Sequence, residues 1–176
     1  MAVPIEIDVW QGEIAELEVD ALIVPATESL FMTIPVARAV KRRSGESVER
    51  DAVEQGPIEA GSAVVTSGGD LAAPYVIHAV AVGHDTQPDT DRLRRAIHAA
   101  LEIAARLGLD RLATAPIGLD RGVFTAEEGA GLLAEVLAER SAAGDSLPSS
   151  LVVAVLSPTE ATAYRAALEP LRTVRR

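Results

Sequence analysis

Short segments with the period of a β-strand alternate along this chain with longer segments that have the period of an α-helix. Ile5, Ile7 and Val9 alternate with polar or amphipathic residues, which predicts a strand with one face toward a core. The run at residues 21–24 is entirely apolar and ends at Pro25, which is typical of a central strand buried on both faces. Similar apolar, β-branched runs predict strands at residues 63–66, 76–82, 112–115 and 151–156.

Helix signals fall between these strands. Pro35 is suited to a first helical turn, and Gly45 marks the end of that segment. Residues 91–107 repeat apolar side chains at helical spacing and are followed by Gly108, a residue suited to a left-handed cap. Two further helix starts are predicted from N-cap spacing, Thr125 with Glu128 and Ser157 with Glu160.

This alternation predicts an α/β fold with a largely parallel sheet covered by helices on both faces. A chain of 176 residues lies in the range in which one hydrophobic core closes. We therefore expect residues 1–176 to form a single domain.

Composition excludes several classes of function. The chain has no cysteine, so thiolate chemistry and disulfides are impossible, and its three histidines are scattered. A formal net charge of −10 opposes binding to a phosphate backbone, so nucleic acid is not an expected partner. No apolar run approaches the ~20 residues needed to span a bilayer. We expect a cytoplasmic protein with no metal, no cofactor and no membrane partner.

Ligands of open α/β sheets bind beyond the carboxyl ends of the strands. The loops selected by this rule run from Pro25 to Ile34 and from Pro116 to Phe124. The second loop contains two glycines and precedes a helix start, a combination that lets backbone N–H groups approach an anion. By itself, this pattern is also common in ordinary turns.

Several blocks of the sequence resemble the macro-domain family in order and spacing. They cover about residues 5–156 and comprise Gly12-Glu13-Ile14 and residues 19–24, 36–40, 61–66, 75–80, 93–108 and 122–124. The resemblance implies a three-layer α/β/α sandwich with a mixed, mostly parallel central sheet and a cleft for ADP-ribose at the strand ends.

The resemblance also implies roles for individual residues. Glu13, followed by Ile14, matches the position of an aspartate that bonds the adenine amino group, and Thr27 matches an asparagine that faces the distal ribose. Two loops would hold the diphosphate. They comprise Pro35, Val36 and Ala37 in the first loop, and Gly118, Leu119, Arg121, Gly122, Val123 and Phe124 in the second.

Departures from the family pattern point away from hydrolysis. The asparagine is Thr27, whose hydroxyl offers one donor where an amide offers two. Pro35 removes a backbone donor from the first loop. The acidic residue that some hydrolytic members carry after the loop valine is Ala37. The sequence thus predicts a binding module for ADP-ribose or a related adenine nucleotide, with ADP-ribosylated protein as a possible partner.

Two alternatives remain open. Gly118-Leu119-Asp120-Arg121 resembles an element of macro domains that remove ADP-ribose from carboxylate side chains, so Asp120 is a candidate catalytic residue of a hydrolase. That branch also uses a lysine, and the only lysine here is Lys41. In the other alternative, Phe31, Met32 and Ile34 fill the pocket and the domain acts through protein contacts.

Overall fold

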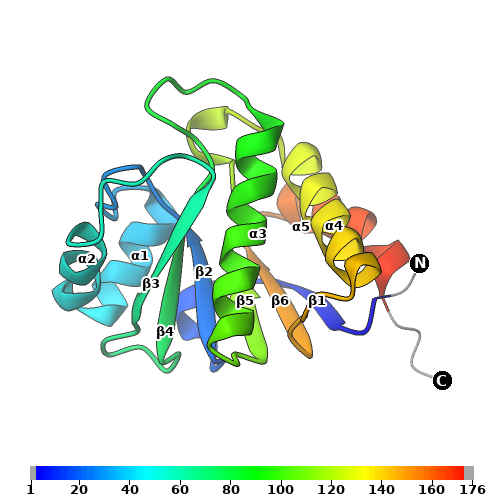
Figure 1. The fold of residues 1–176 in the computed structure, drawn as a ribbon, viewed down its shortest axis with the longest axis horizontal. Helices are drawn as coiled ribbons and strands as arrows, with labels where there is room; N and C mark the ends of the chain where they lie inside the picture. The colour runs from blue at the N-terminus through cyan, green and yellow to red at the C-terminus, as the bar shows by residue number, and fades with distance from the viewer. Residues whose placement is uncertain (1–2, 173–176) are drawn as a thin grey trace.

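The computed structural model describes residues 3–172 and contains one sheet flanked by helices (Figure 1). Each predicted strand is present, within a residue or two of its expected bounds. The strands are β1 (Glu6–Gln11), β2 (Ala21–Pro25), β3 (Ser62–Ser67), β4 (Tyr75–Val80), β5 (Arg111–Thr114) and β6 (Ser150–Val155).

The sheet is mixed and mostly parallel. Its strand order is β1-β6-β5-β2-β4-β3, and only β3 runs antiparallel to its neighbour. Since β2 lies between β5 and β4, the carboxyl ends of these three parallel strands meet at one edge of the sheet. The predicted fold class is confirmed.

Within residues 3–172 the strands are accompanied by five helices and three short 3-10 turns, of which α5 and η3 follow the last strand. They are α1 (Pro35–Ser44), α2 (Glu46–Val53), α3 (Thr90–Arg106), α4 (Ala126–Ala143), α5 (Pro158–Leu168), η1 (Ile14–Glu16), η2 (Asp120–Gly122) and η3 (Glu169–Leu171). None of the helices in residues 3–172 is both long enough and apolar enough to span a membrane.

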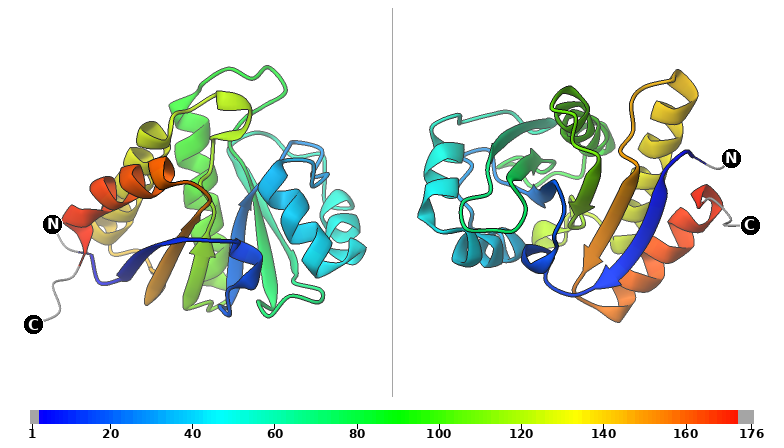
Figure 2. Two further views of the ribbon diagram at one scale, coloured as in Figure 1. Left: turned by 180° about the vertical axis from the view of Figure 1, so that it is seen from behind. Right: turned by 90° about the horizontal axis from the view of Figure 1, so that it is seen from below.

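The helices form two layers, one on each face of the sheet. One core cluster joins α3, α4 and α5 to side chains such as Ile23 and Ile77, and a second joins η1, α1 and α2 to side chains such as Leu22 and Val76. Figure 2 shows α1 and α2 on the face opposite α3. Neighbouring residues of β2 thus enter different cores, which explains its unbroken apolar sequence.

The helix starts follow the predicted capping chemistry. Thr125 and Glu128 form a reciprocal capping box at the start of α4. Ser157 accepts a hydrogen bond from the amide of Glu160 at the start of α5. One helix was not predicted: α2 begins directly after Gly45, without a side-chain cap.

Candidate functional site

A cleft opens at the carboxyl edge of the sheet, beyond β2, β5 and β6. It encloses about 670 Å³, including space open to solvent. Its wall is mostly apolar, with three charged residues. The lining residues are Pro25, Ile34, Pro35, Val36, Pro116, Leu119, Asp120, Arg121, Ala154, Leu156 and Glu160.

The start of α1 forms one side of this cleft. Pro35 is the first helical residue and supplies no N–H, and Val36 lies in the cleft wall. The first amide to bond within the helix is that of Arg38, which donates to the carbonyl of Ile34. The amides of Val36 and Ala37 therefore lie in the unpaired first turn, at the positive end of the helix dipole. The side chain of Ala37 is buried in the core, so only its backbone is available to a ligand.

The β5–α4 loop forms the opposite side and is folded tightly on itself. Gly118 has a φ of +92°, and a Cβ there would lie 3.0 Å from the ring of Phe124. The buried Phe124 donates from its amide to the carbonyl of Gly118 at 3.2 Å. The amides of Gly122 and Val123 donate to the carbonyls of Leu119 and Asp120 at 3.2 and 3.4 Å. The positive φ disfavours any other residue at position 118, and the close contact with Phe124 adds to this restriction.

Asp120 and Arg121 are charged neighbours at the cleft. The side chain of Asp120 is only 6 % exposed, and burial raises the pKa of its carboxyl group above the usual value. The Arg121 guanidinium lies 3.7 Å from this carboxylate and donates to the carbonyl of Gly83 at 3.5 Å. Both contacts are long for a charge-assisted hydrogen bond.

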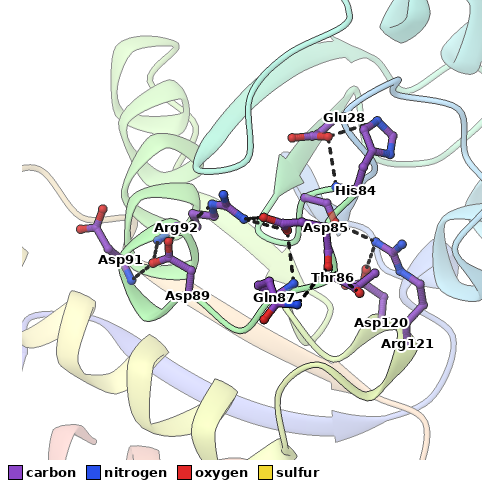
Figure 3. A network of polar contacts seen from close by, with 11 residues as sticks. Glu28, His84, Asp85, Thr86, Gln87, Asp89, Asp91, Arg92, Asp120 and Arg121 are labelled. Carbon is purple, nitrogen blue, oxygen red and sulfur yellow. Dashed lines mark hydrogen bonds and ion pairs between the residues drawn. The ribbon is translucent and has the colours of Figure 1, made fainter.

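A polar network fixes the β4–α3 loop beside the cleft (Figure 3). Glu28 accepts from the backbone amide of His84 at 3.2 Å and lies 3.1 Å from its ring nitrogen. Arg92 of α3 binds both oxygens of Asp85, at 2.9 and 3.0 Å. The hydrogen bond from the backbone amide of Gln87, followed by that from the Arg92 guanidinium, holds the pKa of Asp85 below its usual range. Glu28 carries no local sequence signal, because its partner His84 lies 56 residues away. Arg92 was not predicted either, although its partners Asp85 and Asp89 are close to it in the chain.

The residues predicted for adenine and ribose lie outside the cleft lining. Glu13 is exposed at the start of η1, and its side chain makes no capping bond. Ile14 is buried in the core, so its side chain cannot contact a ligand in this conformation. The hydroxyl of Thr27 lies 3.0 Å from that of Ser29 and donates to the carbonyl of Phe31 at 3.4 Å.

In the alternative that the domain acts through protein contacts, Phe31, Met32 and Ile34 would fill the pocket. The structure places these three side chains in different environments. Phe31 is 49 % exposed, Met32 is buried in the core, and Ile34 lines the cleft. Of these three, only Ile34 therefore contributes to the wall. The cleft is also lined by Leu156, just after β6, and by Glu160, in the first turn of α5, and neither was predicted as a site residue.

His78 does not line the cleft. It lies within β4, fully buried, with its Nε2 3.0 Å from the hydroxyl of Thr66. Burial lowers its pKa to about 4, so the ring is neutral at physiological pH. Within residues 3–172, no group of three or more His, Asp or Glu side chains is arranged to hold a metal ion.

Comparison with known proteins identifies the family. The Macro domain model matches residues 23–133, and the chain belongs to this family. An uncharacterised protein of Aquifex aeolicus is 41% identical over 100 residues, which cover 56% of this chain and 61% of that protein. A Mycobacterium tuberculosis protein, also uncharacterised, is 34% identical over 129 residues, 73% of this chain but 36% of the relative's length. The chain thus spans less than two thirds of either relative.

A solved structure shares the fold. The Trypanosoma brucei macrodomain in complex with ADP-ribose superposes with a TM-score of 0.85 and 18% sequence identity, over 93% of this chain and 69% of that one. This likeness extends across both helical layers and the sheet between them.

Proposed function

We propose that this chain is a binding module for ADP-ribose or a related adenine nucleotide and does not hydrolyse it. The observation that carries the proposal is the unpaired first turn of α1, which faces a cleft at the carboxyl edge of the sheet. A helix N-terminus attracts anions through its free amides and its dipole. The fold is that of a macrodomain solved in complex with ADP-ribose.

Within this proposal, the diphosphate lies between the two loops of the cleft. Val36 and Ala37 offer backbone amides from one side, and the β5–α4 loop closes the other. Thr27 and Glu13 lie at the ends of β2 and β1, on the same edge of the sheet. They are assigned to the distal ribose and to the adenine amino group, respectively.

Glu13→Ala tests the adenine assignment. A hydrogen bond to a charged group contributes about 1.5–3 kcal/mol, so calorimetric titration should give an ADP-ribose Kd about tenfold or more above that of the wild type. Glu13 is exposed and makes no capping bond, so stability should change little. Glu18→Ala removes another exposed carboxylate, five residues along the chain, and serves as the control. Equal affinities of the two variants would remove Glu13 from the site.

If calorimetric titration of the wild type with high micromolar ADP-ribose releases no heat, the binding proposal itself is wrong. We would then expect the domain to act through contacts with other proteins.

A second candidate function, ADP-ribosyl hydrolysis, is favoured by the environment of Asp120. A carboxyl group that is 6 % exposed in a cleft, with a raised pKa, has the character of a general base or nucleophile. If the chain is an enzyme of this kind, it releases ADP-ribose from ADP-ribosylated protein, and Asp120→Ala lowers the rate at least 100-fold while binding remains measurable. Release that persists in Asp120→Ala would exclude this residue as the catalytic group.

A further inference from the structure

Glu49 of α2 is bonded to the β2–α1 loop, residues 26–34, whose last residue lies in the cleft wall. One carboxylate oxygen, Oε2, accepts a hydrogen bond from the backbone amide of Met32 at 2.8 Å, and Oε1 accepts one from the ammonium of Lys41 of α1 at 2.7 Å. We infer that Glu49 is a positioning residue, whose carboxylate holds this loop in the conformation that places Ile34 in the cleft wall. This inference rests on the proposed function, because it assigns a residue that shapes the same cleft for its ligand.

The β2–α1 loop is anchored to α2 through Met32. The side chain of Met32 is buried in the same core cluster as Val48 of α2, and its amide donates to Glu49. Two residues later the chain reaches Ile34, which is both the N-cap of α1 and a part of the cleft wall. Two residues span at most about 7 Å, so a displacement of Met32 is transmitted to the wall.

Helix α2 supports the same loop at a second point, Leu30. This residue is fully buried in a core cluster with Ala52, and its φ of +64° lies in the left-handed region. A residue with a Cβ is disfavoured there, so the surrounding contacts must hold it. Glu49 and Ala52 are three residues apart and lie on one face of α2. Neither Leu30 nor Met32 lines the cleft, so α2 supports the wall from behind.

The two bonds of the Glu49 carboxylate differ in what their loss would do. The side chain of Glu49 is 17 % exposed, and an amide that loses its acceptor in such a place is left poorly solvated. The loop would have to turn the Met32 amide toward water, and Ile34 would move with it. Lys41 is 31 % exposed, so its ammonium is solvated when the ion pair is broken. Mutation can therefore separate the bond to the loop from the ion pair between the helices.

The test measures the affinity of the full chain for ADP-ribose by calorimetric titration, and its stability by urea unfolding. Glu49→Leu removes the acceptor at similar bulk and should weaken ADP-ribose binding at least fivefold. Glu49→Gln keeps a side-chain carbonyl that can accept from the Met32 amide, so it should bind within twofold of the wild type. Lys41→Met is the matched control, because it breaks the same ion pair and keeps the bond to Met32. It should also bind within twofold of the wild type.

A second measurement follows the loop without ligand. Hydrogen exchange of the Met32 amide, measured by NMR, should be at least tenfold faster in Glu49→Leu than in the wild type and should change less than threefold in Lys41→Met. A residue that only stabilised the fold would instead speed exchange in both variants in proportion to their loss of stability. If Glu49→Leu does not fold, Glu49→Asp replaces it. Its carboxylate is one methylene shorter, so ADP-ribose binding should weaken at least threefold.

The possible failures are distinct. If the wild type does not bind ADP-ribose, the proposed function is wrong and this inference falls with it. If the wild type binds ADP-ribose and Glu49→Leu, or Glu49→Asp in its place, binds it within twofold, the proposed function stands and the inference is wrong. Equal losses in Glu49→Leu and Lys41→Met would mean that the ion pair between α1 and α2 shapes the cleft, and not the bond to Met32. That result also overturns the inference.

Discussion

Val36→Glu should abolish detectable ADP-ribose binding and leave the folded protein nearly as stable as the wild type. Val36 is the second residue of α1 and lies in the cleft wall. A carboxylate there would compete for the free amides of the first turn and repel a diphosphate. Two like charges about 4 Å apart near a protein surface interact by about 4 kcal/mol, so a loss of at least about 100-fold is expected.

The fold should tolerate Val36→Glu because of where this residue lies in α1. Val36 is half-buried at the edge of the core, so its replacement removes part of the stabilisation that comes from burying its side chain, about 1 kcal/mol. An acidic side chain in the first turn of a helix gains about 0.3–1 kcal/mol from the dipole, which offsets much of that loss. A thermal melt followed by circular dichroism checks the stability.

Val36→Gln is the matched control for charge. It adds similar bulk without a carboxylate, so it should weaken binding several-fold and no more. If the glutamate and glutamine variants bind ADP-ribose within threefold of each other, the phosphates do not lie at the start of α1. That result would redirect the search to another part of the cleft.

The architecture was largely predictable because local signals and tertiary packing agree. Strands such as β2 carry an apolar run on both faces, and α4 begins with a complete capping box. Helix α2 lacks such a signal. Its N-cap is Gly45, it buries only Val48 and Ala52, and the 2.7 Å ion pair between Lys41 and Glu49 joins it to α1. Tertiary contacts therefore fix α2 more than its own sequence does.

The site was predictable at the level of loops but not of side chains. The carboxyl-end rule selects the loops at residues 25–34 and 116–124, and both contribute residues to the cleft wall, whereas the start of α1 was predicted only from the family resemblance. The contribution of Leu156 depends on β6 lying beside β5, which no local pattern reveals. The bond from the amide of His84 to Glu28 spans 56 residues and follows from the pairing of β2 with β4. Such neighbours follow from strand order, which the sequence pattern alone leaves open.

A second large effect is expected from acidification, through His78. In the folded protein, burial lowers the pKa of this ring from 6.5 to about 4, whereas in the unfolded chain the ring takes up a proton below about pH 6.5. The unfolded state therefore binds more protons between these values. Stability from this group is fully present above pH 6.5 and is lost as the pH falls toward 4, by about 2–3 kcal/mol at most.

His78→Gln isolates this contribution. Glutamine places an amide near the position of Nε2, where it can keep a hydrogen bond with Thr66, and it does not titrate. Urea unfolding of both proteins should give parallel stability curves between pH 7 and 9, because the ring is neutral in both states there. Between pH 6.5 and 4.5 the wild type should lose about 2 kcal/mol more than the variant. Carboxylates with lowered pKa values, such as Asp20 and Asp85, are common to both proteins and cancel in the difference. Curves that stay parallel down to pH 4.5 would show that the buried ring is protonated as readily in the folded protein as in the unfolded chain.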